Sequence, residues 1–504
     1  MPTLPPELFD EAIDHLWDDP TTLRACSLTC RAFVPTARLH IFRTIRIQGA
    51  GHCDRFRALL ATAPGIACCV RRLTICAAYK GVDAEGRALE DDAWVNTIAA
   101  VLPQLTRITT LGIARVRWNA LLAETQCAFA ELFRQIQTLF LFEVRFLASG
   151  DVLDFLSAFP VLSELYFHGV SWENESPAPL PLAIQHPGYM EARKEQERMQ
   201  LSYLFLDPKS SPTLVTEWLL RHPSEQHLRS IQLCWREIDN MKGVGDLLHA
   251  SGASLERLSI EFPAGVPEEA VLQNQISLVH NTGLRSVHFG GLKVAVARTF
   301  LSNHLFPWVT AMISQIRSTH LQEIIFELEL NTVRDLLSLD WARIDRDLSR
   351  EEFKGLTVIF YVSCNDTIIG KAVKDVQKGI SDCLPGFRER GTLSAYLLHF
   401  INQEHGERFF SLLVGELRIA DEGEDSKEQG ASTNRPTSKS CVATDGCDVI
   451  QRGVAPDRGI TPMLHKPRTL REFTTVNVMA LHTTMAMTLR YEVGKEEEEE
   501  GEGE

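Results

Sequence analysis

The residue types that most often bind metals or act as nucleophiles are present, but their spacing does not form a site. Twelve cysteines and sixteen histidines are scattered over 504 residues. Cys26 and Cys30 stand one helical turn apart, yet neither a second cysteine pair nor a neighbouring histidine completes the four ligands that zinc needs. Cys68 and Cys69 are adjacent, and we expect them on opposite faces of a strand. We therefore expect no metal site and no cofactor.

Catalytic motifs with a defined spacing are also missing from the sequence. It contains no Walker-type phosphate loop, no Rossmann glycine fingerprint after a strand, no His-Glu-x-x-His and no Gly-x-Ser-x-Gly. We therefore expect no catalytic residues and a protein that is not an enzyme. A hydrolase or transferase whose site is assembled from distant residues on an α/β body is the less favoured alternative.

Composition and charge indicate which class of protein this is and which partners are disfavoured. Hydrophobic residues make up 44% and charged residues 23%, as in ordinary globular proteins. The net charge is −15, of which residues 492–504 supply −7 through eight Glu and one Lys. This balance disfavours nucleic-acid binding, which needs a basic face. No apolar stretch approaches the length of a membrane span, and the start lacks the pattern of a signal peptide, so we expect no membrane partner and a cytoplasmic or nuclear location with reduced thiols.

The first fifty residues carry the signals of three short helices. Pro5 and Pro6 suit a first helical turn, and Asp19 followed by Pro20 is typical of an N-cap and the first position of a second helix. Apolar residues then lie on one stripe of the first helix: Leu8, Phe9, Ala12, Ile13, Leu16 and Trp17. A third short helix and a strand through Ile45 and Ile47 are expected to follow. Three such helices are marginal alone and need a partner or the next domain.

Residues 4–47 resemble an F-box of the form common in fungal F-box proteins. The resemblance is carried by Leu4-Pro5-Pro6-Glu7-Leu8, Ile13, Leu16, Leu23, the segment Ala25-Cys26-Ser27-Leu28-Thr29-Cys30-Arg31-Ala32-Phe33, and Leu39-His40-Ile41-Phe42. The family docks this motif onto the Skp-type adaptor of SCF ubiquitin ligases, and through the adaptor onto a cullin. The adaptor-binding residues that the resemblance implies are Leu4, Pro5, Leu8, Ile13, Leu16, Leu23, Cys30 and Phe33.

From residue 70 onward a pattern of three apolar anchors recurs, with two variable residues after the first anchor and one after the second. It occurs at Val70/Leu73/Ile75, Ile108/Leu111/Ile113, Ile136/Leu139/Leu141, Leu162/Leu165/Phe167, Leu201/Leu204/Leu206, Leu228/Ile231/Leu233, Leu255/Leu258/Ile260, Leu284/Val287/Phe289, Leu321/Ile324/Phe326 and, more weakly, Leu356/Ile359/Tyr361. Most intervals between central anchors lie within 26–29 residues. The end of each unit predicts a strand, and segments such as 151–159 and 213–221 predict helices.

This pattern resembles an irregular leucine-rich-repeat solenoid with one strand and one helix per unit. One unit cannot bury its apolar side, but stacked neighbours share a core. We therefore predict an α/β chain with a three-helix F-box at 1–47, a repeat region at 48–419, a disordered linker at 420–466, a capping segment at 467–491 and an acidic tail at 492–504. Unrelated α/β units with similar strands are the alternative.

Alternation along the strands also predicts a binding surface. The residue between the last two anchors, and the one two positions before it, point away from the shared core. This projection selects Phe140, Tyr166, Tyr203 and Phe205 as candidate substrate-binding residues, with burial under other segments as the alternative. We expect a substrate-receptor subunit of an SCF-type E3 ubiquitin ligase that binds a protein substrate, or alternatively a non-degradative F-box scaffold.

Overall fold

The chain divides into two units, Met1–Ile419 and Ala420–Glu504, and only the first contains described residues. The computed structural model describes residues 5–82, 88–174, 200–207, 212–220, 227–235, 241–273, 276–293, 305–330, 332–364, 372–402, 408–411 and 417–418. Leu4, the predicted linker, the predicted capping segment and the acidic tail therefore lie outside the described residues.

Three short helices open the described chain, as the proline and capping signals predict. They are α1 (Pro6–Asp14), α2 (Pro20–Thr29) and α3 (Val34–Ile41), with a 3-10 turn at Arg31–Phe33. The Asp19 carboxylate accepts hydrogen bonds from the backbone N–H groups of Thr21 and Thr22, both at 3.0 Å, and so caps α2. We call residues 5–41 the helical module.

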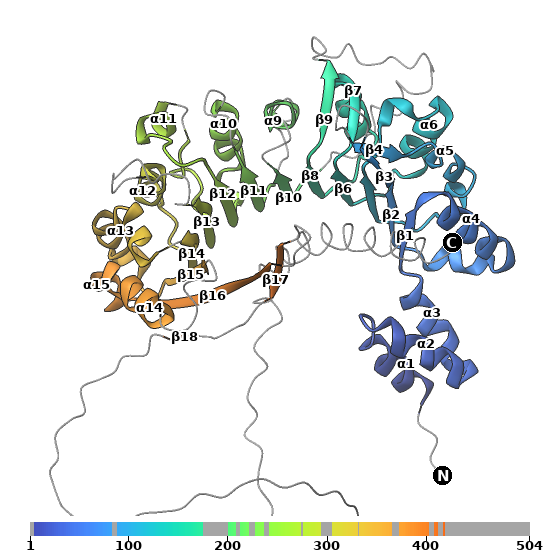
Figure 1. Ribbon diagram of the computed structural model, residues 1–504, viewed down its shortest axis with the longest axis horizontal. Helices are drawn as coiled ribbons and strands as arrows, with labels where there is room; N and C mark the ends of the chain where they lie inside the picture. The colour runs from blue at the N-terminus through green and yellow to red at the C-terminus, as the bar shows by residue number, and fades with distance from the viewer. Residues whose placement is uncertain are drawn as a thin grey trace, which may run out of the picture. The chain divides into compact units, whose positions relative to one another are not determined.

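A 14-stranded sheet dominates the remainder of the described chain (Figure 1). Its parallel strands are β1 (Thr44–Gln48), β2 (Arg72–Cys76), β5 (Thr110–Ala114), β6 (Thr138–Phe142), β8 (Glu164–His168), β10 (Tyr203–Leu206), β11 (Ser230–Cys234), β12 (Arg257–Glu261), β13 (Ser286–Lys293), β14 (Glu323–Leu330), β15 (Thr357–Cys364) and β16 (Thr392–Asn402). Each strand pairs with the next one in this order. Two short strands, β17 (Arg408–Ser411) and β18 (Leu417–Arg418), pair with β16 in the antiparallel sense.

The register of the sheet confirms the first nine repeated units. Their central anchors form one continuous row: Leu73, Leu111, Leu139, Leu165, Leu204, Ile231, Leu258, Val287 and Ile324. Every one of these side chains is at most 1% exposed. The tenth unit is wrong by one residue, because Ile324 pairs with Val358 and not with Ile359. Val358 and Phe360 are therefore buried in the core, and Ile359 and Tyr361 point to the opposite face.

Helices between the strands cover one face of the main sheet and bury the anchor row. They are α4 (Gly49–Thr62), α5 (Val95–Ile98), α6 (Ala123–Leu132), α7 (Ser149–Ser157), α9 (Pro212–Leu220), α10 (Lys242–Ser251), α11 (Glu268–Gln273), α12 (Pro307–Gln315), α13 (Trp341–Leu348), α14 (Ala372–Cys383) and α15 (Pro385–Arg388). Figure 1 shows α9 to α13 on one side of the strands that they connect. We call the opposite side, on which none of these described helices lies, the helix-free face. The predicted helices at 151–159 and 213–221 correspond to α7 and α9.

One apolar core runs from Ile47 to Ala395, and a separate small one lies inside the helical module. The structure thus confirms a mixed α/β chain with a large parallel sheet. Cys68 and Cys69 belong to a 3-10 helix, Pro64–Cys69, so placing them in a strand was wrong. Two further two-stranded sheets are present among the described residues: β3 (Ala78–Val82) pairs with β4 (Ala88–Asp91), and β7 (Arg145–Ala148), which follows β6, pairs with β9 (Ser171–Asn174), which follows β8. No helix in the described part of the chain has the length and apolar composition needed to cross a bilayer.

Candidate functional site

The helical module exposes large apolar side chains to solvent. Five of the ten most exposed large hydrophobic residues of the described chain belong to it: Leu8 (48%), Phe9 (37%), Trp17 (63%), Leu28 (88%) and Leu39 (40%). Single exposed apolar residues are ordinary on protein surfaces, but several within 32 residues indicate a contact surface. We call these five residues the apolar helical surface.

The described residues that the F-box resemblance implies fall into three groups by burial in the helical module. Ile13 and Leu23 are 3% and 1% exposed and form the small core with Ala37, so they hold the helices together. Leu16 and Phe33 are half-buried against that core. Three others are exposed: Pro5, Leu8 and Cys30. The module also exposes Trp17 and Leu28, which are not among the adaptor-binding residues that the resemblance implies.

Polar contacts fix α3 against α1 inside the module. The hydroxyl of Thr36 donates to the carboxylate of Asp10, and His40 Nε2 lies 2.7 Å from Asp14 Oδ1. The phenyl rings of Phe9 and Phe33 have centroids 5.3 Å apart, which joins the start of the module to its middle. The apolar helical surface is therefore carried by helices with defined mutual positions.

The four residues predicted for substrate binding lie together on the helix-free face. The rings of Phe140 and Tyr166 stack with centroids 4.1 Å apart, and Tyr166 lies 4.7 Å from Tyr203 and 6.5 Å from Phe205. The ring of Phe142 stacks on the imidazole of His168 at 4.6 Å. We call these six residues the aromatic patch. Mutual packing leaves Tyr166 and Phe205 only 9% and 8% exposed, whereas the other four are half-buried.

Polar groups border the aromatic patch. The guanidinium of Arg72 lies 5.8 Å from the centroid of the Phe140 ring, within the range of a cation–π contact. Burial raises the pKa of both Tyr166 and Tyr203, so their phenols stay protonated at physiological pH, and the Tyr203 hydroxyl donates a hydrogen bond to Gln232 Oε1 at 3.4 Å. His168 Nδ1 lies 3.1 Å from the buried carboxylate of Asp207. The patch thus combines ring faces with hydrogen-bonding edges, as hot spots of protein interfaces do.

A second polar group on the helix-free face joins three neighbouring strands. Ser259 Oγ is 3.0 Å from His288 Nδ1, and His288 Nε2 is 3.4 Å from Glu327 Oε2. Burial opposes the charge of Glu327, but the contact with His288 and the charge of Lys293 hold the pKa of the carboxyl below its usual value. The order of hydroxyl, imidazole and carboxylate is that of a nucleophile, a base and an orienting group.

The sequence analysis missed these three residues, although a signal for them exists. Ser259 and His288 each lie between the last two anchors of their units, which is the position used to choose Phe140 and Tyr166 as candidates. Glu327 follows the last anchor of its unit, one step further along the strand, where alternation returns a side chain to the same face. Extending the projection by two residues would have found Glu327, and also Phe142 and His168.

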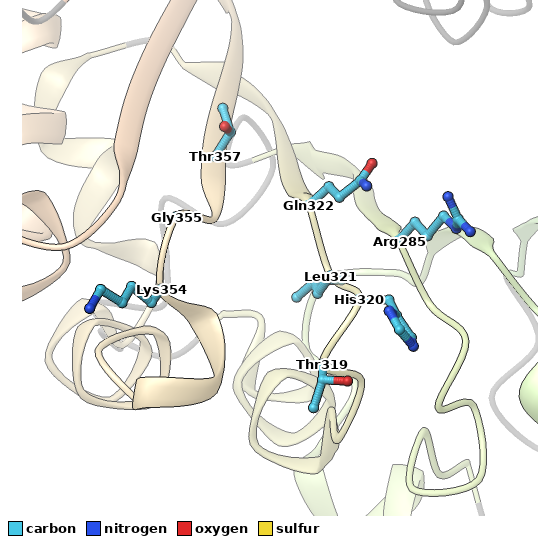
Figure 2. Close-up of a pocket in the computed structure, with 8 residues that line it drawn as sticks. All are labelled: Arg285, Thr319, His320, Leu321, Gln322, Lys354, Gly355 and Thr357. Carbon is cyan, nitrogen blue, oxygen red and sulfur yellow. The ribbon is translucent and has the colours of Figure 1, made fainter.

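A shallow hollow of about 500 Å³ lies at the start of β14 and β15 (Figure 2). It is lined by Arg285, Thr319, His320, Leu321, Gln322, Lys354, Gly355 and Thr357. Figure 2 shows the side chains of Arg285 and Lys354 pointing away from one another. Their cationic groups lie 3.9 Å from Glu256 and 3.8 Å from Glu351, respectively. The basic groups therefore do not converge on one ligand position.

The chain matches no protein-family model and no curated protein. Among the residues whose positions are described, no three His, Cys, Asp or Glu side chains are grouped as metal ligands. The candidate functional site is thus defined by its geometry: the apolar helical surface at one end of the described chain, and the helix-free face of the main sheet.

Proposed function

We propose that this chain is a substrate-receptor subunit of an SCF-type E3 ubiquitin ligase. In this proposal the helical module is an F-box that docks the Skp-type adaptor, and the strand-plus-helix units form an irregular leucine-rich-repeat solenoid. The observation that carries the proposal is the apolar helical surface. A module with a core of three fully buried residues that still exposes Leu28 and Trp17 has apolar area to cover with a partner.

The proposed mechanism is proximity. The receptor holds the substrate on the helix-free face while the helical module holds the adaptor and, through it, the cullin. A substrate lysine then meets the charged conjugating enzyme at a high effective concentration. No residue of this chain acts as acid, base or nucleophile in that mechanism.

Co-purification with a Skp-type adaptor tests the docking step. The variant Leu8→Asp with Leu28→Asp places two charges in the apolar helical surface and should abolish adaptor binding. The matched control is Leu272→Asp, because Leu272 is 56% exposed on α11 and receives the same change outside the module. The control should bind the adaptor as the native chain does. Adaptor binding that survives the double variant, or is equally lost in the control, contradicts the proposal.

The fate of a bound client protein distinguishes a substrate receptor from a non-degradative scaffold. A receptor shortens the lifetime of its client, and a proteasome inhibitor restores it, whereas a scaffold leaves the lifetime unchanged. The variant Phe140→Ala with Tyr203→Ala removes half-buried rings from the aromatic patch while sparing the anchor row. It should stabilise a degraded client and leave adaptor binding intact.

A hydrolase is the alternative that a specific observation favours, namely the Ser259–His288–Glu327 arrangement. A serine activated by such a group reacts with fluorophosphonate probes. Under our proposal the native chain is labelled no more than Ser259→Ala. Stoichiometric labelling of Ser259 that is lost in His288→Ala would instead establish a hydrolase.

A further inference from the structure

Two histidines meet where the end of α10 approaches the turn that precedes β13. His249 lies in the last turn of α10, and His280 lies in the turn before β13. The two imidazole rings contact one another edge to face, with centroids 4.6 Å apart and an interplanar angle of 88°. Both residues are exposed, so an ion in solution can reach the rings.

The ring contact is the only interaction of these two imidazoles with a polar or aromatic group in the described part of the chain. Each ring carries two nitrogens, and in the neutral form one of them has a lone pair that can bind a metal ion. Neither lone pair is therefore occupied by a hydrogen-bond donor among the described residues.

Buried contacts hold the segments that carry the two histidines in fixed positions. The side-chain amide of Asn281 is buried and donates to the carbonyl groups of Leu248 at 2.8 Å and Gly252 at 3.0 Å, at the end of α10. The backbone N–H of Asn281 donates to the carbonyl group of Leu278 at 3.1 Å and closes the turn around His280. Ligands that are positioned before binding lose less conformational entropy when the ion binds.

The separation of the rings fits two ligands of one metal ion. A zinc–nitrogen bond is about 2.0–2.1 Å long, which places the ion about 3 Å from the centroid of each ring. Two imidazoles at about 90–110° around the ion then have centroids about 4.5–5 Å apart. The observed 4.6 Å lies in this range. Because the ring torsion of histidine is broad, rotation of the exposed rings can point one nitrogen of each at a shared ion.

The charge at the end of α10 also favours a cation. The carboxyl end of a helix carries a partial negative charge, and His249 lies in its last turn. Asp246 precedes His249 by one helical turn and adds a carboxylate on the same side of the helix. Imidazole is a ligand for Zn²⁺, Ni²⁺ and Cu²⁺, whereas Mg²⁺ and Ca²⁺ prefer oxygen ligands. The chemistry of the pair is therefore that of a transition-metal site.

We propose that His249 and His280 together bind a zinc ion at the surface of the chain. With two protein ligands, water fills the remaining positions, so the site is open and weaker than a four-ligand structural site. The ion joins the end of α10 to the turn before β13 and stabilises this contact. No metal site was expected from the sequence, because the two ligands come from different units and share no local spacing. The site is independent of the proposed receptor function, and its test has no bearing on adaptor docking.

Hydrogen exchange of the full chain with and without Zn²⁺ tests the proposal. Zinc should slow the exchange of amides at the end of α10 and in residues 276–285, because bound zinc opposes the local opening that separates them. At a free zinc concentration about 100 times the Kd, openings that release the ion should become about 100-fold rarer. Unchanged exchange in both segments overturns the inference. Protection of only one segment indicates binding by a single histidine and overturns it as well.

Single variants assign the effect to the pair of histidines. His249→Ala should abolish the zinc-dependent protection of residues 276–285, and His280→Ala should abolish that of the end of α10. A zinc titration should give a Kd that is weaker by about 10- to 100-fold or more in each, since even the loss of a partner outside the ligand set costs that much. Without zinc, both variants should exchange as the native chain does, because exposed side chains contribute little to stability.

His227→Ala is the matched control. His227 is also exposed, but it makes no ring contact with another histidine among the described residues. The control should keep the zinc-dependent protection of both segments. Protection of both segments that survives His249→Ala or His280→Ala overturns the inference, and so does an equal loss of protection in His227→Ala.

Discussion

The sharpest test of the helical module compares two leucines of α2 that differ only in burial. Leu23 is 1% exposed in the small core with Ile13 and Ala37, whereas Leu28 is 88% exposed. Truncating a buried leucine to alanine costs about 2–5 kcal/mol because it removes buried area and leaves a cavity. Truncating an exposed leucine changes stability by about 0.5 kcal/mol or less. Leu23→Ala should therefore open the module, and Leu28→Ala should not.

The expected size of the effect follows from the size of the module's core. A loss of about 3 kcal/mol corresponds to a roughly 150-fold increase in the equilibrium constant for local opening. Because the core of the module consists of three buried residues, little other buried apolar area remains to stabilise the folded module after such a loss of free energy. Hydrogen exchange followed by mass spectrometry should show protection of the α1, α2 and α3 amides falling by about that factor in Leu23→Ala. Amides of the main sheet serve as the internal reference.

The same pair of variants separates a structural role from a binding role. Leu28→Ala should keep native protection in the module and, under the proposed receptor function, still weaken adaptor binding, since Leu28 belongs to the apolar helical surface. Leu23→Ala should weaken adaptor binding only through loss of the folded module. Equal protection in the two variants would refute the assignment of Leu23 to the core, and native adaptor binding by Leu28→Ala would refute its place in the docking surface.

Three further predictions concern the main sheet and the segments attached to it. Asp92→Asn should lower the free energy of unfolding by about 1–3 kcal/mol at pH 7, because the buried carboxylate accepts hydrogen bonds from Arg117 at 2.7, 2.9 and 3.1 Å. Burial opposes the ionisation of Asp92, but Arg117 holds the pKa of this carboxyl below its usual value. The difference in denaturation midpoint between the native chain and Asp92→Asn should therefore shrink as the pH falls below about 4, where the carboxylate becomes protonated. A difference that stays constant with pH would contradict this. Val358→Asp should unfold the end of the sheet while Ile359→Asp is tolerated, as measured by hydrogen exchange, since only Val358 faces the core; the reverse would restore the register predicted from sequence. Asn281→Ala should cost about 1–3 kcal/mol in thermal or denaturant unfolding, because the buried amide donates at 2.8 and 3.0 Å to two carbonyl groups at the end of α10.

The strand register could be predicted from the sequence where apolar and polar residues alternate clearly. Around Ile231 and Leu258 the anchors are separated by the polar residues Gln232 and Ser259, so only one register buries the right side chains. Around Val358 the run from Leu356 to Val362 is almost entirely apolar. Such a run satisfies two registers equally, and only pairing with β14 selects between them.

The candidate site was predictable in part for a related reason. Phe140, Tyr166, Tyr203 and Phe205 occupy face positions that alternation identifies, so their juxtaposition follows once the strands are in register. The contact between Ser259, His288 and Glu327 depends on residues from three units. Alternation places each of the three residues on the helix-free face, but no local pattern marks their mutual contact, because a serine, a histidine and a glutamate on separate strands look like ordinary solvated positions.

The order of the strands has a consequence for how this protein loses its structure. From β1 to β15, each parallel strand of the main sheet pairs only with the main-sheet strands that come just before and just after it along the chain. Pairings of this kind close short loops and do not require distant segments to meet first. We therefore expect denaturation to spread stepwise from the ends, β1 and β16, towards β10 and β11, with the middle strands the last to melt.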